Sequence, residues 1–221
     1  MINSAFSKNI DNHLLINQLE ELLNQREDSL LKDLFMQKSF NLFNKQYLNF
    51  RKKYTNAKWS IQPISNDQNK SFLDIKLIST RKINDQIYDL HTKQTVKLET
   101  YKNKIKGYEV IDEESILNSQ KSPLIIKIVS PNKVLTGEKY EMNLIIENPL
   151  DNSLTASGII VLKNEDNKKI SNNIFGIKPN QSGGLFKYIQ APLKPGSQTI
   201  SAMITHPEGI YSITKKIKVG L

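Results

Sequence analysis

The sequence contains no cysteine, which excludes disulfide bonds, thiolate catalysis and the usual structural zinc sites. Its three histidines, His13, His91 and His206, lie far apart along the chain and show no metal-ligand spacing. No stretch approaches the roughly 18 apolar residues that a membrane-spanning helix needs. We therefore expect no metal, no cofactor and no membrane span.

Arginine is nearly absent as well. The chain has 31 basic residues, but only Arg26, Arg51 and Arg81 are arginines, and the 28 lysines are spread over its whole length. Arginine is the better reader of phosphates and guanines, because its planar guanidinium donates two parallel hydrogen bonds. The net charge of +9 therefore does not indicate a nucleic-acid partner. Weak binding of an anionic polymer through the lysines stays open as a minor alternative.

The first residues, Met1 to Phe6, show no basic segment followed by an apolar segment and a small-residue cleavage site. We expect a cytoplasmic protein on this basis.

The length of 221 residues suits two domains of about 100 residues each. Hydrophobic residues make up 38% and charged residues 24%, which is a globular composition. A polar stretch near residue 120, followed by Pro123, predicts a linker. We therefore expect an N-terminal helical extension, an α+β domain, a linker and an all-β domain, over residues 1–27, 28–117, 118–123 and 124–221.

A row of six large apolar residues predicts one long helix, because its members recur at steps of three and four residues. These residues are Met36, Phe40, Phe43, Tyr47, Phe50 and Tyr54. Asp28 or Ser29 can cap its start. The basic run at residues 51–53 suits its last turn, where cations complement the helix dipole.

Four strand candidates separated by short turns follow this helix, over residues 58–64, 71–81, 87–101 and 105–111. Asn84-Asp85 and Lys102-Asn103 are expected turns, and the acidic run at 112–114 is expected to end the last strand. The predicted N-terminal domain therefore has long helices packed on a curved four-stranded antiparallel sheet.

From Pro123 onward the helical period disappears. Short strand candidates alternate with breaks rich in proline, glycine and asparagine, which is typical of a β-sandwich. The strands are expected at residues 124–129, 140–147, 158–163, 184–190, 198–205 and 210–219, with a weaker one at 169–175.

Two family resemblances accompany these patterns. The helix, the meander and its closing segment at residues 103–117 resemble the nuclear transport factor 2-like superfamily. This resemblance implies a cone-shaped α+β domain with a cavity that binds small molecules or, in some members, catalyses isomerase or lyase reactions. The second domain resembles bacterial immunoglobulin-like repeats, on the strand ending in Asn-Pro at residues 136–149 and the closing hairpin at 201–209.

Five side chains are candidates for lining such a cavity. Tyr47 and Tyr54 bring hydroxyl groups to the apolar face of the helix, and Trp59 lies where the sheet begins. The alternative for the tyrosines is a hydroxyl that reaches a backbone carbonyl at the edge of the core. Asp89 and His91 share a strand face, where Asp89 could orient His91 as a base, or both could lie on the surface.

No set of residues indicates a particular reaction, and we assign no catalytic residue. The leading interpretation is a non-catalytic binding or assembly protein that acts through protein–protein contacts, with a homodimer through the N-terminal sheet as one form. The alternative is a small-ligand binder or an isomerase- or lyase-like enzyme that uses the N-terminal cavity.

Overall fold

The computed structural model describes residues 3–67, 70–148, 154–162, 176–179 and 183–220. The expected weak strand at 169–175 lies outside these residues. The chain is mostly β, with 59% strand and 21% helix. It divides into unit 1, residues 1–81 and 91–111, and unit 2, residues 82–90 and 112–221.

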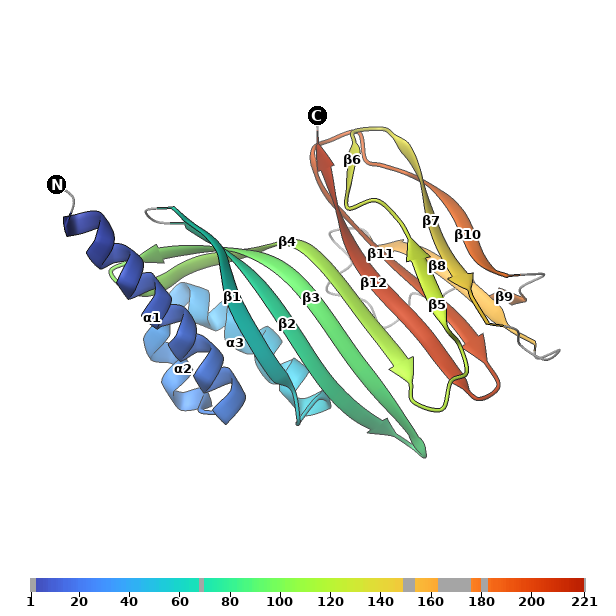
Figure 1. Ribbon diagram of the computed structural model, residues 1–221, viewed down its shortest axis with the longest axis horizontal. Coiled ribbons are helices and arrows are strands. Elements are labelled where there is room, and N and C mark those ends of the chain that lie inside the picture. The colour runs from blue at the N-terminus through green and yellow to red at the C-terminus, as the bar shows by residue number, and fades with distance from the viewer. Residues whose placement is uncertain (1–2, 68–69, 149–153, 163–175, 180–182, 221) are drawn as a thin grey trace. The chain divides into compact units, whose positions relative to one another are not determined.

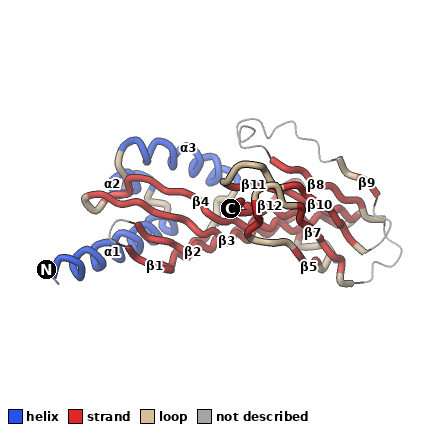
Figure 2. Tube along the Cα trace, turned by 90° about the horizontal axis from the view of Figure 1, so that it is seen from above, coloured by secondary structure: helices blue, strands red, loops and turns tan. Residues whose placement is uncertain are grey.

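Unit 1 begins with three helices, which lie on one face of a sheet of long antiparallel strands (Figures 1 and 2). The elements are α1 (Asn3–Gln25), α2 (Asp28–Leu34), α3 (Gln37–Lys53), β1 (Lys58–Asp67), β2 (Lys70–Ile83), β3 (Gln86–Tyr101) and β4 (Lys104–Ser119). The turn between β3 and β4 is the expected Lys102-Asn103 pair, and both residues have positive φ, as tight hairpin turns require.

Side chains of α1 hold the outer edge of β1. Asn24 accepts a hydrogen bond from the Trp59 amide at 2.8 Å and donates one to the Trp59 carbonyl at 2.9 Å. Glu20 accepts a hydrogen bond from the Ile61 amide at 2.7 Å. These bonds satisfy backbone groups that an edge strand otherwise leaves open, and they fix the strand that carries Trp59 and Ile61.

Unit 2 contains two sheets with a shared core. Its remaining elements are β5 (Ile126–Val129), β6 (Lys133–Leu135), β7 (Lys139–Ile146), β8 (Ala156–Leu162), β9 (Lys178–Pro179), β10 (Gly184–Gln190), β11 (Gly196–His206) and β12 (Gly209–Gly220). The three-stranded sheet has the order β10-β7-β5, and β12, β11 and β8 pair side by side in the other sheet. Met142 and Leu144 from one sheet and Ile200, Ile204 and Ile213 from the other are fully buried in this core.

The expected fold class was wrong in its N-terminal part. The first four strands are not a separate four-stranded sheet, because backbone pairing places them in a nine-stranded sheet with the order β1-β2-β3-β4-β12-β11-β8-β9, with β6 attached to β12. The strand pairs whose register the structure gives are antiparallel, except the parallel β6–β12 pair. The acidic run at 112–114 does not end β4: the strand continues in antiparallel pairing with β12, and Glu114 forms an ion pair with Lys215 across this pairing.

The long helix expected from residue 28 was also wrong, because the chain leaves the helical conformation at Phe35 and Met36. Phe35 is extended, is buried, and forms a parallel bridge with Ile105. The Met36 amide then donates a hydrogen bond to the Ile105 carbonyl at 2.9 Å. Contact with β4 therefore replaces a helical turn and divides the segment into α2 and α3.

Candidate functional site

Unit 1 contains a cavity of about 210 Å³ between its helices and the sheet. All of its lining residues belong to this unit and most are apolar. They are Leu19, Leu23, Phe35, Phe43, Gln46, Tyr47, Phe50, Trp59, Ile61, Leu73, Ile75, Gln94, Val96, Leu98, Ile105, Tyr108 and Val110. A cavity of about 150 Å³ is enough to bind benzene, so this one can hold a molecule of about nine non-hydrogen atoms.

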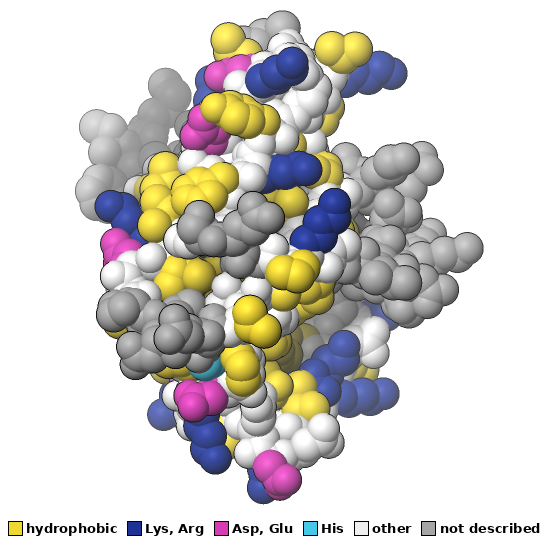
Figure 3. Space-filling view, turned by 90° about the vertical axis from the view of Figure 1, so that its right-hand side faces the viewer, with side chains coloured by type: hydrophobic (Ala, Val, Ile, Leu, Met, Phe, Trp, Pro, Cys, Tyr) yellow, Lys and Arg dark blue, Asp and Glu magenta, His cyan; other side chains and the backbone are white. Residues whose placement is uncertain are grey.

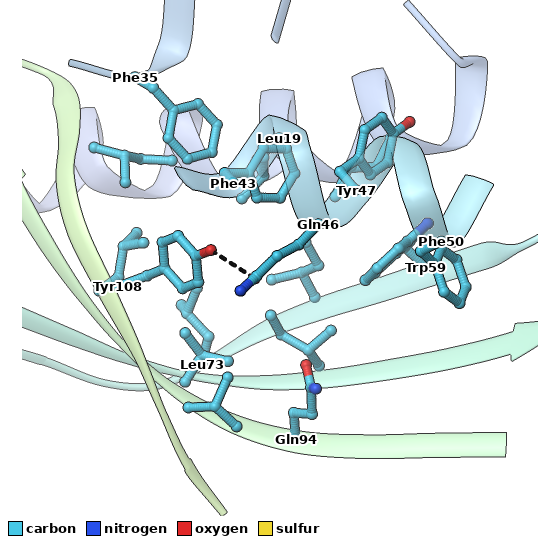
Figure 4. A pocket seen from close by; sticks show the side chains of 17 residues that line it. Leu19, Phe35, Phe43, Gln46, Tyr47, Phe50, Trp59, Leu73, Gln94 and Tyr108 are labelled. Atoms are coloured by element: carbon cyan, nitrogen blue, oxygen red, sulfur yellow. Dashed lines mark hydrogen bonds between the residues drawn. The ribbon is translucent and has the colours of Figure 1, made fainter. Parts of the chain in front are cut away.

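Regular periodicities of the sequence direct these side chains to the cavity. On α3, Phe43, Gln46 and Phe50 are spaced by three and four residues and therefore lie on one face. On β3, Gln94, Val96 and Leu98 alternate along the strand and face the helices. The sheet supplies the floor of the cavity and α3 supplies its roof (Figure 4).

Aromatic rings form much of the wall. Phe43 stacks against Phe35 and Tyr47, with ring centroids 4.8 and 5.2 Å apart, and meets Tyr108 edge-on at 6.2 Å. Across the cavity, Phe50 packs edge-on against Trp59 at 5.8 Å. These contacts form two groups of packed rings that suit a flat apolar ligand.

Two glutamines provide polar groups inside this apolar surface. Gln46 extends from α3 and accepts a hydrogen bond of 3.1 Å from the Tyr108 hydroxyl (Figure 4). Gln94 rises from β3 on the opposite wall, and its amide has no hydrogen bond within the described part of the chain. Gln46 is solvent-exposed, whereas Gln94 is only partly exposed.

The ionisable groups that line the cavity are Tyr47 and Tyr108. Burial, followed by a hydrogen bond of 2.9 Å that the hydroxyl donates to Asp28, raises the pKa of Tyr47 to about 12. The nearby Arg51 guanidinium opposes this rise, and the Tyr47 hydroxyl points away from the cavity. Burial also raises the pKa of Tyr108. Both phenols are therefore neutral near pH 7, and neither is suited to act as a base there.

The five residues singled out from the sequence are not brought together. Tyr47 and Trp59 line the cavity. Tyr54 lies outside its lining, stacks on Phe50 at 5.0 Å and has the Arg81 guanidinium over its ring. Asp89 belongs to unit 2 and accepts a hydrogen bond of 2.8 Å from Gln120, while His91 is exposed.

Sequence reasoning missed the two glutamines and Tyr108 as site residues. The signal for Gln94 is a polar residue that interrupts the apolar face of β3, where it alternates with Val96 and Leu98, whereas Gln46 lies beside an unbroken apolar row and gives no such signal. A polar residue that the fold places among apolar ones needs a partner, because burying its polar atoms without one is unfavourable. Such interruptions are therefore worth treating as candidate binding residues.

We expect the stability of the protein to fall between pH 10 and about pH 12. Burial raises the pKa of Tyr47, Tyr140 and Tyr211 from 10.0 to about 12, with a smaller contribution from Glu114 at Tyr211. A raised pKa means that the folded state holds the proton more tightly, so this stabilisation is complete below pH 10 and lost as the pH rises through the folded value. Urea unfolding across this range should show the decline, and Tyr211→Phe should make it shallower. An unchanged slope in that variant would contradict the assignment.

Part of the chain matches the model of a known family. Residues 121–220 match a family described as Domain of unknown function (DUF8623). The match covers less than half of the chain and none of the residues that line the cavity. No curated protein matches the chain.

The resemblance of the N-terminal part to the nuclear transport factor 2-like superfamily is corrected by these findings. No model of that superfamily matches, and the mostly β architecture with a nine-stranded sheet differs from it. The immunoglobulin-like resemblance of the second part is not supported either, because the family that covers it is described only as a domain of unknown function. Neither resemblance therefore contributes to the functional argument.

The described residues also limit other kinds of site. Among them, no three His, Asp or Glu side chains lie close enough together to hold a metal ion. No described helix is both long and apolar enough to cross a bilayer. On the face shown in Figure 3, lysines and arginines lie between separate groups of hydrophobic side chains and form no continuous basic block.

Proposed function

We propose that unit 1 binds a small, neutral, largely apolar molecule in its cavity without transforming it. The observation that carries this proposal is the cavity of about 210 Å³, walled by aromatic and aliphatic side chains and containing only uncharged polar groups. Apolar walls with a few placed polar groups are characteristic of small-molecule sites. An ionised ligand would lose its hydration there without gaining a charged partner, which disfavours it.

The cavity suits binding better than catalysis. An isomerase or lyase needs an acid or base within reach of its substrate, with a pKa near the working pH. The lining side chains that ionise are two tyrosines, whose pKa values burial raises away from neutrality. This electrostatic setting supports the non-catalytic form of the proposal.

Trp59 gives a direct test, because it is the only tryptophan of the chain and lines the cavity. Titration with acetophenone should change its fluorescence in a saturable manner. Val96→Phe, which adds a ring to the cavity wall, should weaken the apparent affinity at least about tenfold, because the added ring occupies the ligand's volume. Gentle native mass spectrometry of the purified protein would in addition show any ligand that co-purifies.

The matched control is Ile78→Phe, which adds a ring on an exposed position of β2 outside the cavity. This variant should bind acetophenone like the wild type. The absence of a saturable response in the wild type, or an equal loss of affinity in both variants, would contradict the cavity as the binding site. Thermal unfolding of each variant checks that unit 1 remains folded.

Assembly through protein contacts, in the cytoplasm, is our second proposal, with a second copy of the chain as the partner. It is favoured by Phe186 and Tyr188, which are 58% and 71% exposed on β10, an edge strand of the three-stranded sheet. Val129, which is 44% exposed, joins Phe186 in one cross-strand row through Asn143. A row of this kind can pair with itself across a twofold axis.

The outward residues of β1 and β2 are mostly polar and include the exposed Lys76–Asp74 ion pair, so they favour a homodimer less. Light scattering over a concentration series should show a dimer, and Phe186→Ser should shift it to the monomer. A wild-type monomer at all concentrations would contradict this second proposal.

A further inference from the structure

Gln94 on the sheet side of the cavity and Gln46 on the helix side offer different hydrogen-bonding groups to a ligand, and this difference indicates the class of ligand. This inference rests on the proposed function of the cavity. Gln94 presents an amide oxygen and an amide NH₂ group side by side, and neither has a hydrogen bond within the described chain. Gln46 already uses its oxygen to accept from Tyr108, so its NH₂ group remains available as a donor.

An amide is the group that complements Gln94 best. The side-chain amide of glutamine can donate one hydrogen bond and accept another in the same plane, so a ligand with an N–H beside a C=O can form both at once. A ligand with only an acceptor leaves the Gln94 oxygen unpaired, and a hydrocarbon leaves both atoms unpaired. Leaving a desolvated donor or acceptor without a partner costs about 1–3 kcal/mol, which favours the matched ligand.

The rest of the lining indicates the shape and charge of the ligand. Phe43 with Tyr108 and Phe50 with Trp59 form ring pairs on opposite sides of the space, which suits a flat ring between them. No lysine, arginine, aspartate, glutamate or histidine belongs to the lining, so a charged group would have no counter-ion. The volume of about 210 Å³ corresponds to about nine non-hydrogen atoms.

We infer that the cavity selects a neutral aromatic or cyclic amide of this size, whose N–H and C=O pair with Gln94. Carboxamides on a single ring and ring lactams share this chemistry. Gln94 then determines specificity within a site whose affinity comes mainly from the apolar walls.

The test uses four probes of nearly equal size and shape: cumene, acetophenone, benzamide and benzoate. They share a phenyl ring and differ in the attached group, which offers no polar atom, an acceptor, an acceptor with a donor, and a negative charge. Each is titrated into the full chain, with Trp59 fluorescence as the readout and calorimetry as the second measurement. We expect benzamide to bind about tenfold more tightly than acetophenone, cumene to bind more weakly still, and benzoate not to bind.

Gln94→Leu should remove the preference for benzamide and improve the binding of cumene, because the cavity then has an apolar group in that position. Gln62→Leu is the matched control: the same substitution at an exposed residue of β1 whose side chain is outside the cavity. This control should keep the wild-type order of affinities.

The outcomes separate this inference from the proposed function. Equal binding of benzamide, acetophenone and cumene, or a preference that survives in Gln94→Leu, would overturn the selection of amides while the cavity stays a binding site. No binding of any neutral probe, in the wild type and in Gln94→Leu, would overturn both.

Discussion

Replacing Gly184 by alanine should lower the free energy of unfolding of unit 2 by about 4 kcal/mol or more. Gly184 begins β10, pairs with Ile145 and has a φ of 141°, a region that side chains other than glycine rarely adopt. A Cβ atom there would lie 2.0 Å from the carbonyl oxygen of Leu144. The neighbour is backbone, so the clash can be relieved only by moving β7 and β10 apart, and β7 carries the fully buried Met142 and Leu144.

Substitutions at two other glycines separate the cost of backbone strain from the cost of the steric clash. Gly183 has a φ of 60°, and no atom of the described residues would lie within 4 Å of a Cβ there, so Gly183→Ala isolates backbone strain and should cost about 1 kcal/mol. Gly107 does not have a positive φ, and a Cβ added there would meet no described atom within 4 Å, so Gly107→Ala should change stability by less than about 0.5 kcal/mol.

Urea unfolding followed by circular dichroism measures all three variants, and a decrease for Gly184→Ala no larger than for Gly183→Ala would contradict the steric argument. Where Gly184→Ala is too unstable to purify, the fraction of soluble protein relative to Gly183→Ala carries the same comparison.

Local patterns of the sequence predicted the parts of unit 1 that depend on local physics. The spacing from Met36 to Tyr54 places Phe43, Tyr47 and Phe50 on one face of a helix, and α3 has this face toward the sheet. Lys102-Asn103 forms the expected turn because neighbouring strands leave only two residues to reverse the chain. Alternation along β3 likewise orients Val96 and Leu98, which are buried against the helices.

The features that went unpredicted depend on residues that are distant in sequence. The break between α2 and α3 exists because Phe35 is held against Ile105, and no local sequence pattern predicts this contact. The continuation of β4 through its acidic residues accompanies pairing with β12, which lies near the end of the chain and carries Lys215 opposite Glu114.

The cavity was not predictable from the sequence. It exists because the side chains between helices and sheet do not fill the space that the backbone encloses, and the same set of apolar residues could also fill a core completely. Gln94 was not predicted as a site residue either, although its place beside Val96 and Leu98 on one strand face is a signal that could have identified it.

The ion pair between β4 and β12 gives the second large expected effect. Lys215 is 5% exposed and lies on the core-facing side of β12, and its ammonium is 3.5 Å from the Glu114 carboxylate. Glu114→Ala leaves this cation buried without its counter-ion, and we expect a loss of about 3 kcal/mol in the free energy of unfolding. Lys215→Met should cost less, because the Glu114 side chain is 34% exposed and can be hydrated after its partner is removed.

The double variant Glu114→Ala with Lys215→Met should recover most of the stability lost in Glu114→Ala, because it no longer leaves a buried cation without its partner. The coupling energy from the four proteins should therefore exceed about 1 kcal/mol. Asp74→Ala provides the matched control, since Asp74 pairs with Lys76 at a similar distance of 3.6 Å but both side chains are well exposed. An exposed pair of this kind contributes at most about 1 kcal/mol.

Urea unfolding at constant pH measures the whole set. Equal losses for Glu114→Ala and Asp74→Ala would contradict a buried pair at β4–β12. A large loss for Glu114→Ala that the double variant recovers would show that Lys215 needs a carboxylate because of its burial. The charge of residue 114 would then be required for stability only while Lys215 is present.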